Sequence, residues 1–252
     1  MIPDKYLYIS PRQASQTLIT HILEAMEKEP ERSFTIALSG GTTPAVLFEV
    51  WEREFAAYTP WARLYFYWVD ERCVPPTDAQ SNFGLADRLL FGKINLPASH
   101  YYRIVGEGAP GEEAILYSSL VKATVPTVDE VPVFDFVLLG VGEDGHTSSV
   151  FPDRKDLLTA AEPYAVSVNP YNKTVRICMT GKPMIEAKHT CFLVTGENKC
   201  SILKKMLDKE HLNTTTFLRT ARRSRAPLRR LRSHYEFECS AVAYIPITSF
   251  FR

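Results

Sequence analysis

Polar residues that could do chemistry gather at one point of the chain, directly after an apolar run. Residues 134–141 read FDFVLLGV, a composition typical of a central strand buried on both faces. Residues 142–149 then read GEDGHTSS and hold two carboxylates, an imidazole and three hydroxyls between glycines. An imidazole such as that of His146 titrates near neutral pH and could take a proton from water. The carboxyl end of a buried strand is where open α/β sheets bind their ligands.

The same loop has a plainer interpretation, as a strand-to-helix connection that Asp144 or Ser148 caps. We favour a catalytic role for His146, because a surface histidine does not need two carboxylates and two glycines around it. For Ser148 the two interpretations are balanced. Neither Ser148 nor Ser149 lies in a GxSxG elbow, so the sequence argues against a serine nucleophile.

A second candidate site lies at a glycine-rich turn earlier in the chain. Residues 34–38 resemble a buried strand, residues 39–44 read SGGTTP, and residues 45–57 are expected to be helical. This order builds an anion site, because unpaired backbone N–H groups and the positive end of the helix dipole point at one spot. The turn is neither a Walker motif nor GxGxxG, so it predicts phosphate binding without implying a nucleotide. The alternative is a tight turn before a capped helix.

Charge also appears abruptly after the apolar stretch 64–69, where the chain continues with Asp70, Glu71 and Arg72. Such a group is often a self-neutralising surface cluster. We favour a functional role, because parallel strands would place it at the same sheet edge as the glycine turn and His146.

The order of the remaining elements predicts the fold class. A strand is expected at 6–9 and a helix at 11–28 with Ser10 as its cap, since its apolar residues keep the spacing of one buried face. Further helices are expected at 81–91, 112–123 and 200–209, and further strands at 165–168, 174–179 and 191–194. This alternation predicts one α/β domain over residues 1–252, with a mainly parallel sheet between helical layers.

Composition limits the class of partner. Lys plus Arg and Asp plus Glu both number 29, so nothing in the net charge suggests a nucleic acid or an anionic membrane. No apolar run approaches the roughly 20 residues of a membrane span, and the first residues lack the form of a signal peptide. The five cysteines include no CxxC pair, which favours buried thiols in a reducing compartment over disulfides or a zinc site. We expect a cytoplasmic protein.

Several of these motifs together resemble the 6-phosphogluconolactonases. The resemblance rests on SGGTTP at 39–44, DERCVP at 70–75, GVGEDGHTSSVFP at 140–152, VRICMT at 175–180 and TGENK at 195–199, in that order. It implies a three-layer, Rossmann-like α/β/α sandwich that hydrolyses 6-phospho-D-glucono-1,5-lactone to 6-phospho-D-gluconate in the oxidative pentose phosphate pathway. It also implies a small phosphosugar lactone as partner, and neither a metal nor an organic cofactor. We expect a monomer or a homodimer.

The resemblance also assigns roles to residues. His146 would be the catalytic base, near Asp144, Asp70, Glu71 and Arg72. Phosphate would be bound by Gly40, Gly41, Thr42 and Thr43, joined by Arg176 and Lys199.

The chemistry of lactone opening agrees with these roles. A base that takes the proton of the attacking water contributes about 10²–10⁴-fold. Asp144 or Glu143 could fix the imidazole tautomer. Arg72 or the backbone N–H groups of residues 142–146 could stabilise the oxyanion, and one such donor is worth roughly 10²–10³-fold.

Two alternatives remain open. Glucosamine-6-phosphate deaminases of the same superfamily share the glycine turn, and there Asp70 could act as base toward a carbon-bound proton. In those enzymes the GHxxF loop continues into NEP and the earlier motif reads DEY, whereas this chain has SVFP at 149–152 and DER at 70–72. A non-catalytic phosphosugar-binding regulator would keep the glycine turn, Arg176 and Lys199 but would not need His146.

The last stretch departs from the family pattern. After Lys209 the chain has eight arginines and no lysine, whereas before it has nine arginines against twelve lysines including Lys209 itself. A basic tail that binds RNA or another partner is one interpretation. A shifted reading frame is simpler, and it predicts that residues 216–252 pack poorly or are disordered.

Overall fold

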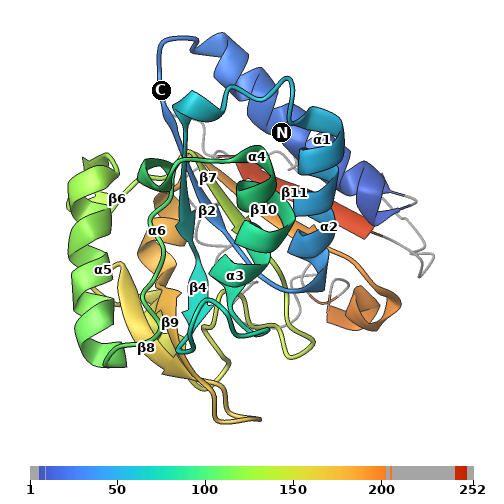
Figure 1. The fold of residues 1–252 in the computed structure, drawn as a ribbon. Helices are drawn as coiled ribbons and strands as arrows, with labels where there is room; N and C mark the ends of the chain where they lie inside the picture. The colour runs from blue at the N-terminus through green and yellow to red at the C-terminus, as the bar shows by residue number, and fades with distance from the viewer. Residues whose placement is uncertain (1–5, 9, 203–204, 206–241, 249–252) are drawn as a thin grey trace.

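A six-stranded sheet lies at the centre of the protein. The computed structural model describes residues 6–8, 10–202, 205 and 242–248 (Figure 1). The strand order is β1-β11-β10-β7-β2-β3. These strands are β1 (Tyr6–Tyr8), β2 (Phe34–Leu38), β3 (Leu64–Trp68), β7 (Phe136–Leu139), β10 (His189–Val194) and β11 (Val242–Thr248). The run β10-β7-β2-β3 is parallel, and β11 is antiparallel to both of its neighbours.

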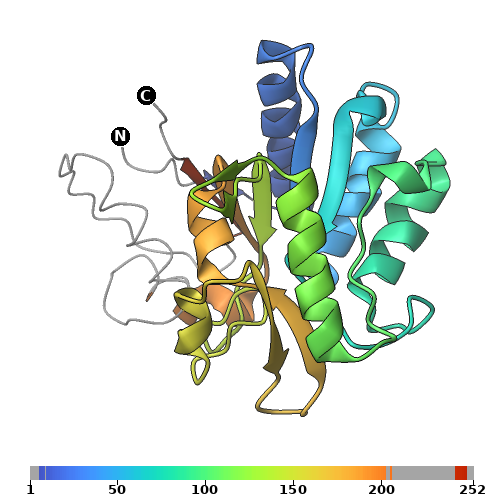
Figure 2. The same ribbon diagram turned by 90° about the vertical axis from the view of Figure 1, so that its left-hand side faces the viewer.

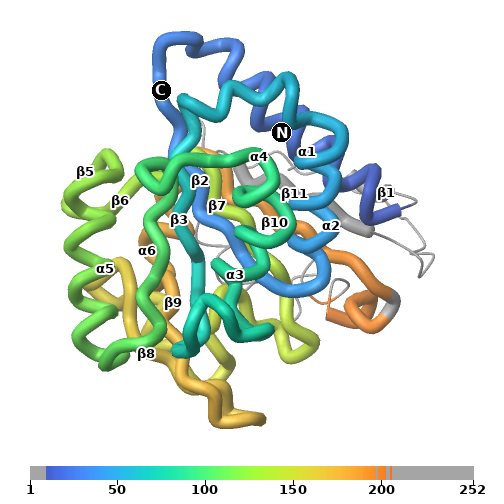
Figure 3. Tube along the Cα trace, viewed as in Figure 1, coloured from blue at the N-terminus to red at the C-terminus, as the bar shows by residue number. Residues whose placement is uncertain are grey.

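The central strands are the apolar runs of the sequence. Every residue of β2 and β7 is buried, as a strand covered on both faces requires. Figure 3 shows β7, β2 and β3 side by side, with α1 and α2 on one side of them and α5 on the other. The predicted mainly parallel α/β sandwich is therefore confirmed.

Helices cover both faces of the sheet (Figures 1 and 2). The first helix is capped as predicted, with the Ser10 hydroxyl accepting from the Gln13 backbone N–H at 3.3 Å. One face carries α1 (Pro11–Lys28), α2 (Thr42–Val50), α3 (Asn82–Ala86) and α4 (Gly92–Ile94). A π-helical turn at Trp51–Phe55 extends α2, and another at Asp87–Phe91 joins α3 to α4. The other face carries α5 (Pro110–Thr124) and α6 (Gly181–Glu186).

A second, antiparallel sheet was not predicted. It has the order β4-β9-β8, built from β4 (Asp70–Arg72), β9 (Val175–Met179) and β8 (Tyr164–Val168). The strands predicted at 165–168 and 174–179 are present, but the short turn between them folds them into a hairpin. Residues 70–72, expected as a polar loop, pair with β9. A separate hairpin joins β5 (Thr127–Val128) to β6 (Val131–Pro132).

The end of the chain contributes a strand to the main sheet. In β11, Tyr244 pairs with Leu193 of β10 and with Tyr6 of β1. The backbone of residues 242–248 thus fills the position between two strands, while poor packing of residues 216–252 stays a prediction. The other residues of 216–252 lie outside the described part. Of the helix predicted at 200–209, residues 200–202 and 205 are helical and the rest is not described.

Candidate functional site

The polar segments singled out in the sequence meet at one edge of the sheet. Because β2, β3, β7 and β10 are parallel, their carboxyl ends lie together. The glycine turn follows β2, β4 follows β3, the His146 loop follows β7, and residues 195–199 follow β10.

A tight turn holds His146. The Gly142 N–H donates to the His146 carbonyl at 2.8 Å, and Gly145 adopts a φ of +85°, which favours glycine. The His146 ring lies against Gly142, where a Cβ would come within 2.2 Å of Nδ1. Its other neighbour is Phe151, with the ring centroids 4.5 Å apart. Backbone and aromatic packing thus fix the position of the imidazole.

Asp144 orients that imidazole. Its Oδ1 lies 2.6 Å from Nδ1 of His146 and accepts from the His146 backbone N–H at 3.1 Å. A carboxylate at Nδ1 favours the tautomer with the proton on Nδ1, which leaves Nε2 as the basic nitrogen. Among the described residues, no hydrogen bond occupies Nε2. Glu143, the alternative partner, points instead to Asn198 and to Lys199, whose Nζ lies 3.9 Å from Oε1.

Asp144 is held as an anion. Burial acts to raise its pKa, but hydrogen bonds from the His146 ring and backbone and from Tyr171 outweigh that effect, so the pKa of Asp144 lies well below its usual range. Tyr171, on the loop between β8 and β9, donates its hydroxyl to Oδ2 at 2.8 Å.

The three hydroxyls after His146 all make structural hydrogen bonds. Thr147 donates to the Gly140 carbonyl at 2.7 Å, and Ser148 to the Val69 carbonyl at 2.7 Å. Ser149 donates to Asp70 Oδ2. No α-helix begins here, since residues 155–158 form only a 3₁₀ turn, so the helix-capping interpretation of Asp144 and Ser148 is wrong.

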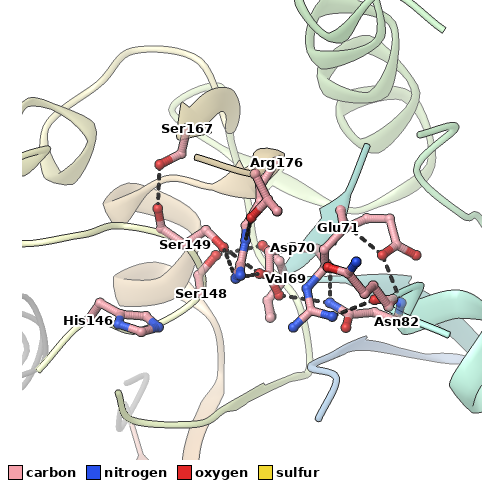
Figure 4. Close-up of polar contacts among 12 residues, drawn as sticks. Val69, Asp70, Glu71, Asn82, His146, Ser148, Ser149, Ser167 and Arg176 are labelled. Atoms are coloured by element: carbon pink, nitrogen blue, oxygen red, sulfur yellow. Dashed lines mark hydrogen bonds and ion pairs between the residues drawn. The ribbon is translucent and has the colours of Figure 1, made fainter. Parts of the chain in front are cut away.

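Ser149 belongs to a buried ionic cluster with Asp70 and Arg176 (Figure 4). Arg176 Nη1 donates to Ser149 Oγ at 3.2 Å and lies 3.7 Å from Asp70 Oδ2. The guanidinium carbon lies 5.7 Å from the Phe151 ring centroid, so Phe151 contacts both Arg176 and His146. Burial lowers the pKa of Arg176, although an arginine stays charged. Such a half-desolvated cation is a ready partner for an anion.

Glu71 is engaged on both of its oxygens. It is 2% exposed and accepts from the backbone N–H groups of Arg72, Asn82 and Phe83 and from the Ser81 hydroxyl. Burial raises the pKa of Glu71, against the lowering effect of these donors. Its carboxylate therefore anchors the start of α3. Figure 4 shows it on the far side of Asp70 from His146.

The glycine turn is joined to this cluster. A Cβ at Gly40 would come within 1.8 Å of the Asn82 side-chain oxygen, and Asn82 donates to the Asp70 carbonyl at 2.8 Å and to Oδ1 at 3.1 Å. Gly41, at a φ of +103°, directly precedes α2, and no side chain of the described residues caps that helix. The Thr43 hydroxyl lies 2.6 Å from that of Thr195. Within the part of the chain that the structure describes, the N–H groups of the first turn are therefore available to an anion.

Arg72 lies next to this edge. It stands opposite Arg176 in the pairing of β4 with β9, which places both on one face of the small sheet. Its guanidinium donates to the Gln80 carbonyl.

Sequence reasoning missed several residues that build the site. Asn82, Ser149, Phe151 and Thr195 join the predicted residues to one another, and Tyr171 completes the surroundings of Asp144. The repeated SS at 148–149 offered a signal for Ser149. Tyr171 had none, because it lies in an ordinary hairpin loop.

Within the described ranges, no group of three His, Cys, Asp or Glu side chains is placed to hold a metal ion. In the same part of the chain, no helix combines the length and apolar character that crossing a membrane demands.

The comparisons with known proteins decide the family. Residues 10–232 match the family described as glucosamine-6-phosphate isomerases/6-phosphogluconolactonase. The chain belongs to this family. It is 39% identical to the 6-phosphogluconolactonase of Treponema pallidum over 176 residues, 70% of this chain and 73% of that protein. It is 39% identical to that of Haemophilus influenzae over 177 residues, 68% and 72% of the two chains.

A solved structure agrees with this family assignment. The 6-phosphogluconolactonase from Trypanosoma cruzi superposes with a TM-score of 0.73 at 26% identity, covering 83% of this chain and 86% of that one. Both halves of the family name remain compatible with the fold, but these relatives bear the lactonase name.

Proposed function

We propose that this protein hydrolyses 6-phospho-D-glucono-1,5-lactone to 6-phospho-D-gluconate. The names of its relatives support this reaction. The observation that carries the proposal is the His146–Asp144 pair, 2.6 Å apart, with Nε2 of the imidazole left without a hydrogen bond from the described residues. This is the arrangement of an oriented general base.

In the proposed reaction, Nε2 of His146 takes a proton from water as the water oxygen bonds to the lactone carbonyl carbon. The carbonyl π electrons move onto its oxygen, where Arg72 or the backbone N–H groups of residues 142–146 stabilise the charge. When the carbonyl re-forms, the bond to the ring oxygen breaks. The imidazolium, stabilised by Asp144, returns its proton to that leaving oxygen, so the base is regenerated.

The phosphate is bound, in this proposal, by the start of α2 and two cations. The N–H groups around Gly40, Gly41, Thr42 and Thr43 and the helix dipole attract an anion. A dianion needs more compensation than one helix end supplies, and Arg176 and Lys199 provide it. Both side chains are partly buried, at 12% and 23% exposure.

Asp70 and Glu71 serve this site by positioning other groups. Asp70 accepts from Ser149 on one oxygen and from Asn82 on the other, so it is poorly placed to act as the base that the deaminase alternative needs. The regulator alternative leaves the His146–Asp144 pair without a purpose. Both observations favour the lactonase.

The setting of the reaction completes the proposal. The enzyme acts in the oxidative pentose phosphate pathway in the cytoplasm, as a single domain, without a metal or organic cofactor. Its partner is the small phosphosugar, with no role for nucleic acid or membrane, and the enzyme is a monomer or a homodimer.

The test measures lactone hydrolysis against ammonia release from glucosamine 6-phosphate. We expect hydrolysis alone, and ammonia release alone would refute the proposal. Arg176→Ala should raise KM for the phosphorylated lactone about tenfold or more. Arg103→Ala, which removes a bridge to Glu107 and a contact with the Phe83 ring, should not. An equal loss on the unphosphorylated lactone would contradict the phosphate role of Arg176.

A further inference from the structure

Tyr171 is anchored to the site from outside it. Its hydroxyl donates to Oδ2 of Asp144 at 2.8 Å, while Oδ1 of the same carboxylate serves the ring and backbone of His146. The carboxylate is therefore held from two sides, and its rotation is blocked at both oxygens.

The loop that carries Tyr171 is preformed. The Asn169 side-chain oxygen accepts from the backbone N–H groups of Tyr171 at 2.9 Å and Asn172 at 3.3 Å. The Asn169 N–H donates to the Thr174 carbonyl at 2.9 Å, and Lys173 adopts a φ of +60°. This turn projects Tyr171 toward Asp144 without an ordering step.

Burial does not explain the position of Tyr171, because 70% of the residue is exposed. An exposed aromatic ring gains little from packing. Tyr171 differs from an ordinary surface tyrosine because its hydroxyl donates a hydrogen bond to Asp144, the carboxylate that orients His146.

We propose that Tyr171 is a positioning residue of the hydrolytic reaction, acting on His146 through the Asp144 carboxylate that the two residues share. This inference rests on the proposed function. The phenol draws on the same negative charge that stabilises the imidazolium. Without it, the whole carboxylate charge serves the imidazolium, which then keeps its proton to a higher pH.

Other charged groups near this chain of contacts stay unchanged in the test. They are Glu143 on the same loop, Asp153 beyond Phe151, Asp70 on β4, Arg176 on β9 and Lys199 after β10. A change seen on removing one hydroxyl is therefore assigned to the shared carboxylate.

The kinetic test compares Tyr171→Phe with Tyr58→Phe, which alters a tyrosine that is 79% exposed and remote from the site. In Tyr171→Phe, kcat for the phosphorylated lactone should fall about fivefold with KM unchanged. The acid limb of the pH–rate profile should move to higher pH. Tyr58→Phe should match the wild type in both respects. A loss that is equal at every pH, or no loss, would overturn the inference while wild-type hydrolysis still supported the proposed function.

A second measurement needs no substrate. The hydrogen bond to Asp144 raises the pKa of Tyr171. In protein labelled with ¹³C at the tyrosine Cζ, the Tyr171 signal, identified by its loss in Tyr171→Phe, should titrate at lower pH in Asp144→Asn than in the wild type. An unchanged titration would show that the contact is not made in solution and would overturn the inference. A wild type that shows the contact but hydrolyses no lactone would instead overturn the proposed function, and the kinetic role of Tyr171 with it.

Discussion

Two strands of the parallel sheet, β3 and β7, each run into an acidic segment, and the two segments reach opposite states. After β3, Glu71 is 2% exposed and four donors occupy its oxygens. After β7, the side chains of Asp144 and His146 are 18% and 25% exposed, and Nε2 of the imidazole is not engaged by the described residues.

The difference arises from what each segment pairs with. The segment after β3 becomes β4, pairs with β9 and receives the N–H groups at the start of α3. The segment after β7 turns back on itself at Gly142 and Gly145, so the donors to Asp144 are the backbone and ring of His146 and the Tyr171 hydroxyl. Charged residues that follow a strand therefore indicate the edge of the sheet where a site is expected. The number of hydrogen-bond donors around each carboxylate decides whether it serves the structure or remains available to a neighbouring side chain.

The largest expected effect is a loss of kcat, from a change in the segment after β7. His146→Ala should lower kcat by about 10²-fold or more, because no other described group is placed to take the proton from water. Its melting temperature should stay close to that of the wild type. Ser148→Ala, which removes hydrogen bonds to the Val69 and Met179 carbonyls, should keep kcat within about twofold. Near wild-type kcat in His146→Ala with an inactive Ser148→Ala would refute the general-base mechanism.

Adding a single methyl group to the segment after β7 should also lower kcat. Gly142→Ala would place a Cβ 2.2 Å from Nδ1 of His146 and 2.6 Å from Asp144 Oδ1, so the imidazole must move. We expect kcat to fall about tenfold or more, since a displacement near 1 Å has large effects. The matched control is Gly140→Ala, whose Cβ would meet nothing within 4 Å. Equal rates in the two variants would show that the position of the ring does not matter.

In the segment after β3, a substitution should lower the free energy of unfolding. Glu71→Ala leaves three backbone N–H groups and a hydroxyl without their acceptor, so the free energy of unfolding should fall by about 3 kcal/mol or more. Glu113→Ala removes the acceptor of the Val105 N–H alone and should cost about 1 kcal/mol. Urea denaturation measures both. If Glu71→Ala were as stable as the wild type but inactive, Glu71 would serve catalysis and not stability, which contradicts this prediction.

The smallest expected effect is a loss of stability at acidic pH. Asp144 has a pKa below its ordinary value, so its contribution to stability is present above the unfolded-state pKa of about 3.9 and is lost as pH falls through the lower folded value. The stability difference between wild type and Asp144→Asn should therefore be largest near neutral pH and shrink below about pH 4. A difference that stays constant down to pH 2 would mean that the hydrogen bonds to Asp144 do not stabilise its charge.

The contrast also explains how much could be predicted from the sequence. β2 and β7 were predictable because buried parallel strands are continuous apolar runs, and their order placed the polar loops at one edge. The strand β4 was not, because Asp70, Glu71 and Arg72 form a strand only through pairing with β9, about a hundred residues later.

The residues that link the parts of the site were missed for the same reason. Ser149 contacts Asp70 and Tyr171 contacts Asp144 across long stretches of chain, and no local pattern reveals either partner. By contrast, His146 was found because glycines and carboxylates surround it within a few positions. Local patterns were sufficient to single out His146 and Asp144, but not Tyr171, which contacts Asp144 from a distant loop.

The position of β11 has a consequence for synthesis. Within the described part, β1 pairs only with β11, so this strand finds its partner in a strand that is made much later in translation. Until residues 242–248 leave the ribosome, one edge of β10 and both edges of β1 are open to other chains. Folding of this sheet can begin during translation from β2, β3, β7 and β10, but joining β1 to it must wait until β11 is released.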